Sequence, residues 1–303
     1  MTLFRLAHVT DPHFRGFAGA RPGDFVSKRA LGAVNLLLVR RRKHRMELLE
    51  ALNDDLRGRG VDHLALTGDL ANVSLPAEWD AAQRWLDAYG AGPQAITVIP
   101  GNHDAYVEEV VRTRAFEARF HRYQSAEVRA GDHTYPFARL RGEVALVAVN
   151  TCVATGDLGA WGEIGGGQLE RLEALLTDAR VRGLVRVVLL HHPPVMHKGG
   201  EHRNLRDRQA LAAVLARAGA ELVLHGHDHR DEATRLAGPG GASIPAVGAG
   251  SASYAGKAGK RSRYNVYEIE DGRITAVTYA HDLSAGAYRE VRRELLSAAD
   301  RAA

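Results

Sequence analysis

Short apolar runs alternate along the chain with longer segments in which apolar residues recur every three or four positions. The short runs are rich in β-branched residues and leucine, and they predict buried strands at residues 3–9, 63–67, 95–99, 144–149, 184–190 and 221–224. The helical spacing is clearest at residues 46–57, 76–89, 168–180 and 206–217. Alternation of this kind predicts a layered α/β fold.

The last part of the chain has a different pattern. Strands are predicted at residues 244–247, 264–269 and 274–279, and Asp271 and Gly272 form a turn sequence between the last two. We expect an antiparallel hairpin here that closes a second sheet. Because the 303 residues contain neither an internal repeat nor a low-complexity linker, a single domain over residues 1–303 is predicted.

Composition limits the class of protein without indicating an activity. The chain is 45% apolar and 25% charged, as ordinary globular proteins are, and its formal net charge of +4 is too small to indicate specific binding of nucleic acid. Residues 1–9 do not resemble a leader peptide, and the single cysteine, Cys152, cannot form an internal disulfide. No apolar run approaches the roughly 20 residues of a membrane span. We therefore expect a cytoplasmic protein.

The candidate chemistry lies in five short segments, each at the end of a predicted strand. They are residues 11–13, 68–69, 101–104, 191–193 and 226–229. Since ligands bind at the carboxyl ends of the strands in α/β sheets, these loops can converge on one crevice. Residues two apart in an extended chain project to the same side, so Asp11 with His13, and His227 with His229, are each expected to face one site. Glycines 68, 101 and 226 are expected to let the backbone turn sharply beside it.

The side chains in these segments are typical metal ligands. Carboxylate, amide and imidazole groups suit divalent ions such as Mn, Fe or Zn, and the lack of cysteine argues against a thiolate zinc site. Seven candidates exceed what one ion takes from a protein, so we expect two ions that share a carboxylate, the arrangement that cleaves phosphoesters. The predicted ligands are Asp11, His13, Asp69, Asn102, His191, His227 and His229.

The order of these segments also carries a family resemblance. Asp-x-His, Gly-Asp, Gly-Asn-His-Asp, His-His-Pro-Pro and Gly-His-x-His, between Asp11 and His229, resemble the calcineurin-like metallophosphoesterase superfamily. Within it, the pattern is most similar to class III cyclic nucleotide phosphodiesterases and related glycerophosphodiesterases. The resemblance implies a four-layer αββα sandwich, in which helices flank two mixed β-sheets packed face to face.

The resemblance further implies which residues share an ion. One ion would be held by Asp11, His13, Asp69 and His229. The other would be held by Asp69, Asn102, His191 and His227. Asp69 would thus bridge the two ions, and a water or hydroxide between them would be the nucleophile.

A histidine beside the amide ligand has a second implied role. His103 would stabilise the phosphate charge and protonate the leaving oxygen, and Asp104 would orient His103. One departure from the family is Asn72, which stands where many members have an aspartate, so this chain offers no carboxylate at that position. His192 and His225 adjoin ligands but match no ligand position, and we expect them to pack or to support the ligands.

Residues 14–45 form an insert that is the least family-like segment. It is apolar over residues 30–39, and seven basic residues but no acidic one fall between residues 25 and 46. The basic residues are Lys28, Arg29, Arg40, Arg41, Arg42, Lys43 and Arg45. Two interpretations stay open. Residues 28–45 could be an amphipathic cap that touches the inner face of a membrane or a lipid-linked substrate, or a helix packed on the domain edge with a solvated basic end.

Residues 197–207 offer a second candidate for the wall of a substrate site. They follow His191 along the chain and contain Arg203 and Asn204, either of which could hold a phosphate oxygen. The alternative is a mobile surface loop whose polar residues cap a helix. Neither this loop nor the insert identifies a substrate.

The leading functional hypothesis is hydrolysis of a small phosphodiester, such as a cyclic nucleotide or a glycerophosphodiester. The alternative is cleavage of a lipid-linked, UDP-sugar type pyrophosphate at the membrane surface, although such enzymes of this superfamily generally carry arginine in place of His103. A nuclease would need a stronger positive charge. The non-enzyme alternative is a metal-free binding scaffold, and the presence of all seven ligand types argues against it.

Overall fold

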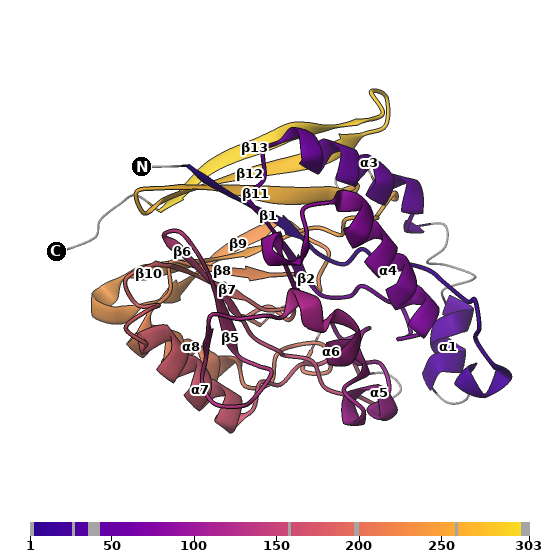
Figure 1. Ribbon diagram of the computed structural model, residues 1–303, viewed down its shortest axis with the longest axis horizontal. Helices are drawn as coiled ribbons and strands as arrows, with labels where there is room; N and C mark the ends of the chain where they lie inside the picture. The colour runs from indigo at the N-terminus through magenta and orange to yellow at the C-terminus, as the bar shows by residue number, and fades with distance from the viewer. Residues whose placement is uncertain are drawn as a thin grey trace.

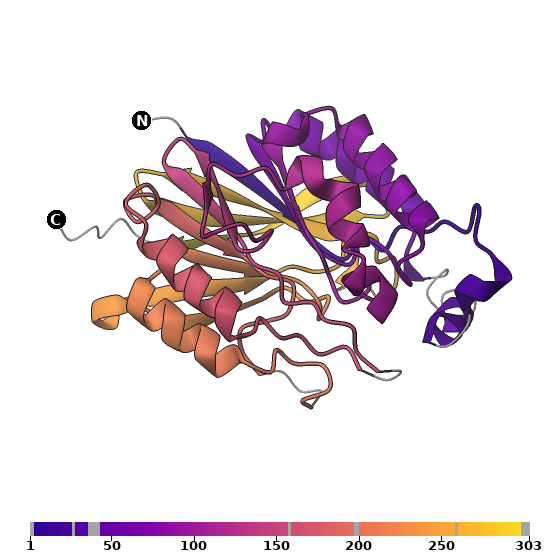
Figure 2. The same cartoon turned by 60° about the horizontal axis from the view of Figure 1, so that its bottom comes forward.

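The protein consists of two β-sheets packed face to face, with helices on both outer faces (Figure 1, Figure 2). The structure is a computed structural model that describes residues 3–25, 28–35, 43–156, 159–196, 200–257 and 260–297. Both sheets are mixed, because each combines parallel and antiparallel strand pairs. The predicted four-layer αββα sandwich is therefore confirmed.

The first sheet has six strands in the order β13-β12-β11-β1-β2-β3. In chain order they are β1 (Phe4–Val9), β2 (His63–Thr67), β3 (Ile96–Ile99), β11 (Arg263–Glu270), β12 (Arg273–Asp282) and β13 (Ala287–Ser297). The helices on its outer face are α3 (Met46–Gly58), α4 (Pro76–Tyr89), α5 (Glu108–Arg112) and α6 (Ala115–Phe120). The parallel strands β1, β2 and β3 end at the same edge of this sheet.

The second sheet has seven strands in the order β4-β5-β6-β7-β8-β10-β9. They are β4 (Val128–Arg129), β5 (Phe137–Arg141), β6 (Val144–Ala148), β7 (Val185–Leu189), β8 (Leu222–His225), β9 (Glu232–Ala237) and β10 (Ser243–Gly248). Its outer face is covered by α7 (Gly166–Thr177) and α8 (Arg208–Ala218). Short 3-10 helices are η1 (Pro22–Phe25), η3 (Pro93–Ala95), η4 (His121–Tyr123) and η5 (Pro239–Gly241).

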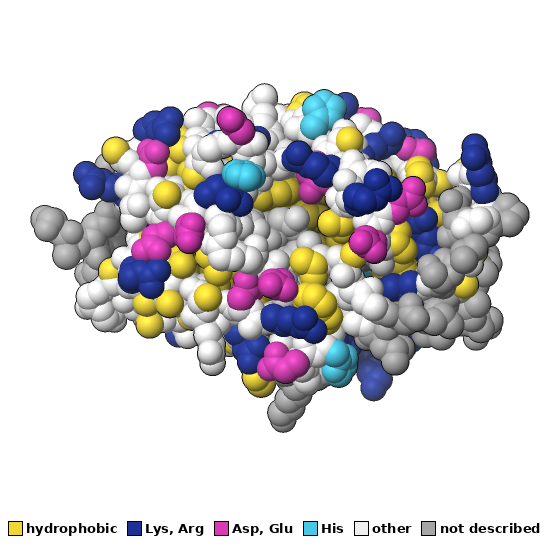
Figure 3. Space-filling view, turned by 90° about the horizontal axis from the view of Figure 1, so that it is seen from below, with side chains coloured by type: hydrophobic (Ala, Val, Ile, Leu, Met, Phe, Trp, Pro, Cys, Tyr) yellow, Lys and Arg dark blue, Asp and Glu magenta, His cyan; other side chains and the backbone are white. Residues whose placement is uncertain are grey.

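The surface beneath the second sheet carries charges of both signs. On the face that lies at the bottom of Figure 1, Lys and Arg side chains are interspersed with Asp and Glu (Figure 3). Mixed charge of this kind agrees with the small net charge of the sequence. Within the described ranges, no helix combines the length and the apolar composition needed to cross a membrane.

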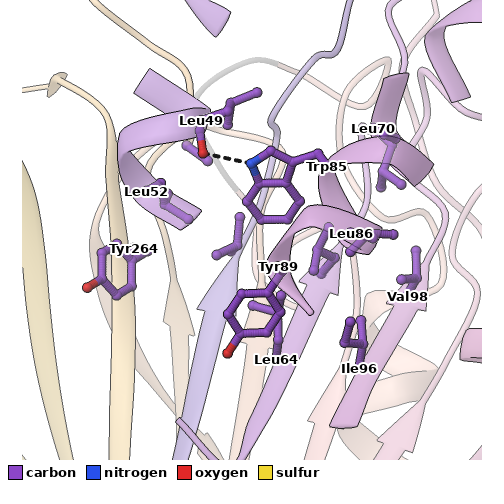
Figure 4. Packing of buried hydrophobic residues seen from close by; sticks show 14 of the residues in the cluster. Leu49, Leu52, Leu64, Leu70, Trp85, Leu86, Tyr89, Ile96, Val98 and Tyr264 are labelled. Atoms are coloured by element: carbon purple, nitrogen blue, oxygen red, sulfur yellow. Dashed lines mark hydrogen bonds between the residues drawn. The ribbon is translucent and has the colours of Figure 1, made fainter. Parts of the chain in front are cut away.

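Buried aromatic and aliphatic side chains hold the helices on the first sheet (Figure 4). Trp85 on α4 donates a hydrogen bond from its indole Nε1 to the carbonyl of Leu49 on α3, at 2.7 Å. Asn53 on α3 donates in return to the carbonyl of Trp85, at 2.9 Å. These bonds satisfy polar groups within an apolar layer, so α3 and α4 are fixed to each other on the first sheet.

The C-terminal strands differ from the sequence-based expectation. The predicted hairpin exists as β11 and β12, and its turn places Asp271 and Gly272 at φ 52° and 78°. It pairs with β1, however, and so extends the first sheet instead of closing a second one. The sequence analysis missed β13, in which five of the eleven residues are Arg or Glu and most side chains are exposed. A charged edge strand lacks the apolar alternation that predicts a strand, and it protects the sheet edge from pairing with other chains.

The insert contains η1 and α1 (Lys28–Asn35), and α1 lies at the right-hand edge of Figure 1. Lys28 donates to the hydroxyl of Thr155 at 2.8 Å, and Arg29 donates from Nε to the carbonyl of Val73 at 3.0 Å. Both cations therefore bind within the protein, which favours the interpretation of a helix packed on the domain edge. Residues 36–42, which contain much of the basic run, lie outside the described residues.

Candidate metal centre

The loops after β1, β2, β3, β7 and β8 meet at one edge of the two sheets, as the sequence predicts. All five predicted ligand segments occupy these loops. Backbone hydrogen bonds tie the first two loops together, because the amides of Asp11 and His13 donate to the carbonyls of Gly68 and Asp69, at 3.1 and 3.0 Å. The amide of Gly226 donates to the carbonyl of His191 at 3.0 Å and joins the two loops of the second sheet.

Four side chains form the first group of donors. Nε2 of His229 lies 3.1 Å from Oδ1 of Asp11 and 3.2 Å from Nε2 of His13. Nε2 of His13 lies 3.8 Å from Oδ2 of Asp69. One ligand atom from each of these four residues falls within 4.8 Å of the others, a spacing that a single ion can span. The structure thus brings together the four residues that the family resemblance assigns to one ion.

The second group lies on the other side of Asp69. Oδ1 of Asn102 is 3.1 Å from Nε2 of His191 and 2.9 Å from Nδ1 of His227. Nε2 of His191 is also 3.4 Å from Oδ1 of Asp69. Since Asp69 turns one carboxylate oxygen to each group, it is placed to bridge two ions. The donor set, with its carboxylate, amide and imidazole groups, fits a pair of divalent ions such as Mn, Fe or Zn.

The backbone at five of the predicted ligands is left-handed, which corrects the expectation of extended chain. Asp11 and His13 have φ 51° and 48°, and His227 and His229 have φ 72° and 52°. Asp69 has φ 54°. Each such residue costs roughly 1 to 2 kcal/mol relative to ordinary backbone, and strain of this kind gathers at functional sites. The members of each pair face the site because both adopt the left-handed conformation, and not because a strand continues through them.

Backbone carbonyls hold three of the imidazoles in one tautomer. Nδ1 of His13 donates to the carbonyl of Ala71 at 3.2 Å, and Nδ1 of His191 donates to that of Thr67 at 2.7 Å. Nε2 of His227 donates to the carbonyl of Arg203 at 3.0 Å. The opposite nitrogen of each ring, which faces the donor cluster, therefore carries the lone pair that a metal ion needs.

The titration behaviour of two predicted ligands suits metal binding. Burial, together with the neighbouring His192 and His191, holds the pKa of His227 well below its usual value, so its imidazole is neutral near pH 7. Burial alone would raise the pKa of Asp11, but the adjacent imidazoles, with His229 first, hold it well below the usual value. A neutral imidazole and an ionised carboxylate are the forms that coordinate a cation.

The glycines in the ligand loops serve two different purposes. Gly68 has φ 91° and makes the predicted sharp turn, and a Cβ there would also lie 2.5 Å from the backbone nitrogen of Gly101. At Gly101 a Cβ atom would overlap the backbone nitrogen and Oδ1 of Asp69, and at Gly226 it would overlap the hydroxyl of Thr10 and lie 2.6 Å from Oδ2 of Asp11. Gly101 and Gly226 are therefore needed for close approach of the backbone and not for a turn.

Gly226→Ala is expected to displace Asp11 and to weaken binding of the first ion. Overpacking a rigid site costs about 1 to 3 kcal/mol, so the free energy of unfolding should fall by that amount. Urea unfolding and metal analysis after dialysis measure the two effects. Gly183→Ala is the matched control, because a Cβ there meets no atom within 4 Å. Equal metal content in the two variants would contradict this account of Gly226.

His103 is oriented by a backbone carbonyl and not by Asp104, which corrects the implied role of Asp104. Nδ1 of His103 donates to the carbonyl of Asn72 at 2.5 Å. The Asp104 carboxylate accepts bonds from the amides of Leu70, Ala71 and Gly101 and from the indole of Trp79. Asp104 thereby clamps the loops after β2 and β3 together, and it acts on the site only through the backbone.

Asn72 is part of the same support. Its side-chain amide donates to the carbonyls of His13 and Phe14, at 3.2 and 2.8 Å, and its own carbonyl holds His103. The family aspartate at this position is thus replaced by a residue that ties the first loop to the second. The ring of His103 also stacks on Tyr106, with centroids 5.5 Å apart and an interplanar angle of 12°.

Glu78 on α4 holds the loop that carries Asn72, and this predicts a pH effect on stability. Its buried carboxylate accepts the amides of Asn72, Val73 and Leu75. Burial, only partly offset by these bonds, raises its pKa from 4.5 to about 7. Because the folded protein binds this proton more tightly than the unfolded chain, the contribution to stability is largest below pH 4.5 and falls as the pH rises through 7.

In metal-free protein, the free energy of unfolding of the wild type should therefore fall between pH 5 and pH 8. The decrease should be larger than in Glu78→Gln, whose side chain does not titrate. The extra fall should be on the order of 2 kcal/mol. Urea unfolding at the two pH values measures it. Parallel pH profiles for the two proteins would show that Glu78 is not the group responsible.

The remaining buried histidines have structural partners. His8 and His63 share hydrogen bonds with the hydroxyls of Thr67 and Thr97, each at 2.8 Å. Nδ1 of His192 lies 2.8 Å from the hydroxyl of Thr151, and its ring packs 4.6 Å from that of His227. His225 is also buried, beside the ligand loop that begins at Gly226. These contacts agree with the expectation that the non-ligand histidines pack or support.

A cavity of 360 Å³ opens beside the second donor group. Nearly all of the residues that line it are polar: Asp69, Asn102, His103, Ala160, His202, Arg203, His227, Asp228 and His229. Arg203 thus lies where a substrate contact was predicted. Asn204 is buried instead, and its amide donates to the carbonyl of Gly200 at 2.9 Å, so its position favours a role in shaping the loop.

Two residues near the donors were missed by the sequence analysis. Asp228 lines the cavity between two predicted ligands, and its position inside Gly-His-Asp-His was the available signal. His44 lies against His13 and His229, with ring centroids 4.8 and 5.7 Å away. It sits within a basic run, where no pattern in the sequence distinguishes it.

Comparison with known proteins gives the context for this geometry. Residues 4–231 match the family described as calcineurin-like phosphoesterase. No curated protein matches the sequence significantly. A dimetal phosphatase from Danio rerio has a similar structure, with a TM-score of 0.57, 14% identity and coverage of 97% of this chain and 98% of that one.

A purple acid phosphatase from yellow lupin seeds is also similar, with a TM-score of 0.59 and 12% identity. The alignment covers 95% of this chain but 53% of the lupin enzyme, so this chain spans about half of it. At these identities the likeness shows the fold, whereas the family match spans most of the sequence. The chain therefore belongs to the calcineurin-like phosphoesterase family and is a metal-dependent phosphoester hydrolase.

Proposed function

We propose that the protein hydrolyses small phosphodiesters, such as a cyclic nucleotide or a glycerophosphodiester. The observation that carries this proposal is the small polar cavity beside the donor groups, in which His103, Arg203 and Asp228 face the same space. Two bound divalent ions would supply a hydroxide nucleophile at neutral pH and neutralise phosphate charge. Asp11, His13, Asp69, Asn102, His191, His227 and His229 are the residues that would hold them.

In this proposal His103 delivers the proton that an alcohol leaving group needs. Its Nδ1 donates to the carbonyl of Asn72, so Nε2 is the atom that gives up or takes the proton. The stacked ring of Tyr106 and the bond to Asn72 fix the imidazole at the cavity wall. A positioned acid of this kind contributes roughly 10²- to 10⁴-fold to the rate.

The charges at the cavity wall favour a diester over a monoester. Arg203 offers a guanidinium for a phosphate oxygen, while Asp228 lines the same cavity and its carboxylate opposes negative charge. A phosphodiester carries one negative charge, whereas a monoester carries nearly two at pH 7. The electrostatic repulsion from the Asp228 carboxylate is therefore larger for the monoester than for the diester.

The described part of the cavity gives less support to a lipid-linked pyrophosphate. Ala160 is the one apolar residue on the described wall, whereas two acyl chains need an extended apolar groove. Lys28 and Arg29 of the insert bind Thr155 and Val73 within the protein, and so do not present their charges to a membrane. Contact of the insert with a membrane surface is a second proposal, which would rest on residues 36–42.

The test is a panel of substrates with the protein reconstituted in turn with Mn, Fe, Zn and Mg. The panel contains bis(p-nitrophenyl) phosphate, cyclic AMP, a glycerophosphodiester, p-nitrophenyl phosphate and a diacylated nucleotide sugar. We expect kcat/KM to be highest for a diester, and we expect Asp228→Asn to raise activity on the monoester relative to the diester. Highest activity on the diacylated nucleotide sugar or on the monoester would refute the proposal.

A further inference from the structure

His44 is a buried imidazole at the end of the insert, next to the first donor group. It is 4% exposed, although its neighbours Lys43 and Arg45 point to solvent. A polar ring is buried only where it has partners, so the burial of His44 between two exposed basic residues indicates specific contacts in the interior.

Backbone pairing fixes the position of His44. The amide of Arg45 donates to the carbonyl of Ser253 at 2.9 Å, and the amide of Ala255 donates to the carbonyl of Lys43 at 2.6 Å. The partner segment is itself bound to the first ligand loop, because the hydroxyl of Ser251 donates to the carbonyl of Asp11 at 2.7 Å. His44 is therefore held on a short ladder that is anchored to the first predicted ligand.

The ring of His44 faces two predicted ligands. One ring nitrogen from each of His13, His44 and His229 lies within 4.8 Å of the other two. Two ligand nitrogens on opposite sides of a transition-metal ion are about 4.2 Å apart, since each bond is about 2.1 Å long. The three imidazoles thus have nearly the spacing of ligands that share an ion, before any adjustment on binding.

The hydrogen bonds at these rings favour a cation between them. Nδ1 of His13 donates to Ala71, so Nε2 of His13 presents a lone pair to the cluster. Nδ1 of His44 lies 2.8 Å from the buried hydroxyl of Ser253. If that nitrogen is the donor, Nε2 of His44 likewise presents a lone pair, and lone pairs that face one another are stabilised by a metal ion.

We propose that His44 is a fifth protein ligand, through Nε2, of the ion held by Asp11, His13, Asp69 and His229. Ser253 then fixes its tautomer, as the carbonyls of Ala71 and Thr67 do for His13 and His191. Three imidazoles at this ion favour Zn or Fe over Mg, which prefers oxygen ligands. The insert would thus complete the metal centre and determine which metal it takes. The proposal depends on metal binding, but not on which phosphoester is hydrolysed.

The test measures zinc binding by competition with a chelator in the wild type and in four variants. His44→Ala and His44→Gln should each lower the affinity for one of the two ions by about 100-fold or more. The reason is that even residues that only support a ligand contribute about 10- to 100-fold to metal affinity. Ser253→Ala should lower the affinity for the same ion by about 10-fold. The matched control is His133→Ala, which removes an exposed histidine and should change neither ion.

A spectroscopic measurement separates ligation from indirect effects. In cobalt-loaded protein, loss of an imidazole ligand should change the visible absorption of one ion in His44→Ala, whereas Ser253→Ala should keep the wild-type band. Wild-type zinc affinity and an unchanged cobalt spectrum in both His44 variants would overturn the proposal. This holds even if the KM of these variants changes. A wild type that binds no ion would instead overturn the metal centre as a whole.

Discussion

Replacing Asp69 with asparagine (Asp69→Asn) is expected to release both ions and to lower kcat by about 10³-fold or more. Asp69 is the residue through which the two donor groups are joined, because Oδ2 lies 3.8 Å from His13 and Oδ1 lies 3.4 Å from His191. An amide keeps the shape of the side chain but removes the negative charge that two cations share. Metal analysis after dialysis, together with turnover of bis(p-nitrophenyl) phosphate, measures both effects.

Two other variants make this prediction specific. Asn102→Ala and His191→Ala should each weaken binding of one ion and leave the other ion bound, because these side chains lie in the second donor group alone. Asp132→Asn, at an exposed carboxylate, should retain both ions and full activity. Retention of two tightly bound ions in Asp69→Asn would show that Asp69 does not bridge them.

Removing the imidazole of His103 should slow catalysis without emptying the metal centre. We expect His103→Ala to lower kcat by roughly 10²- to 10³-fold on an alkyl diester, whose alkoxide leaves slowly without a proton. The loss on bis(p-nitrophenyl) phosphate should be much smaller, because p-nitrophenolate is a stable leaving group. Metal content should remain close to two ions per chain, the number expected from the donor set.

The comparison between leaving groups is the decisive part of the His103 experiment. Tyr106→Phe is its control, since phenylalanine keeps the ring that stacks on His103. Equal losses for the alkyl and the nitrophenyl diester in His103→Ala would argue that His103 stabilises phosphate charge and does not protonate the leaving oxygen. Loss of both ions in this variant would overturn its assignment outright.

The sequence predicted the fold and the convergence of the ligand loops because both depend on local patterns. Buried strands such as β2 are centred on short apolar runs, and the predicted ligands follow shortly after those strands end. The conformation of the ligands was not predictable in the same way. Asp11, His13 and His229 are left-handed, and this strain is maintained by contacts with distant loops instead of by neighbouring residues.

The residues that were missed or misassigned have partners far away in the sequence. His44 is positioned by Ser253, and the Asp104 carboxylate accepts backbone amides from the loop after β2. Backbone donors leave no trace in a sequence, so a carboxylate that binds them looks the same as one that orients a side chain. The charged strand β13 was not predicted for a related reason, because its pairing with β12 is made by the backbone.

Anomalous X-ray diffraction from crystals grown with zinc or manganese tests the central claim most directly. We predict two peaks roughly 3.5 to 4 Å apart, one on each side of the Asp69 carboxylate, with the first between Asp11 and His229 and the second between Asn102 and His191. A single peak away from Asp69, or no peak at a metal concentration that supports turnover, would contradict the account of a two-ion phosphoesterase centre.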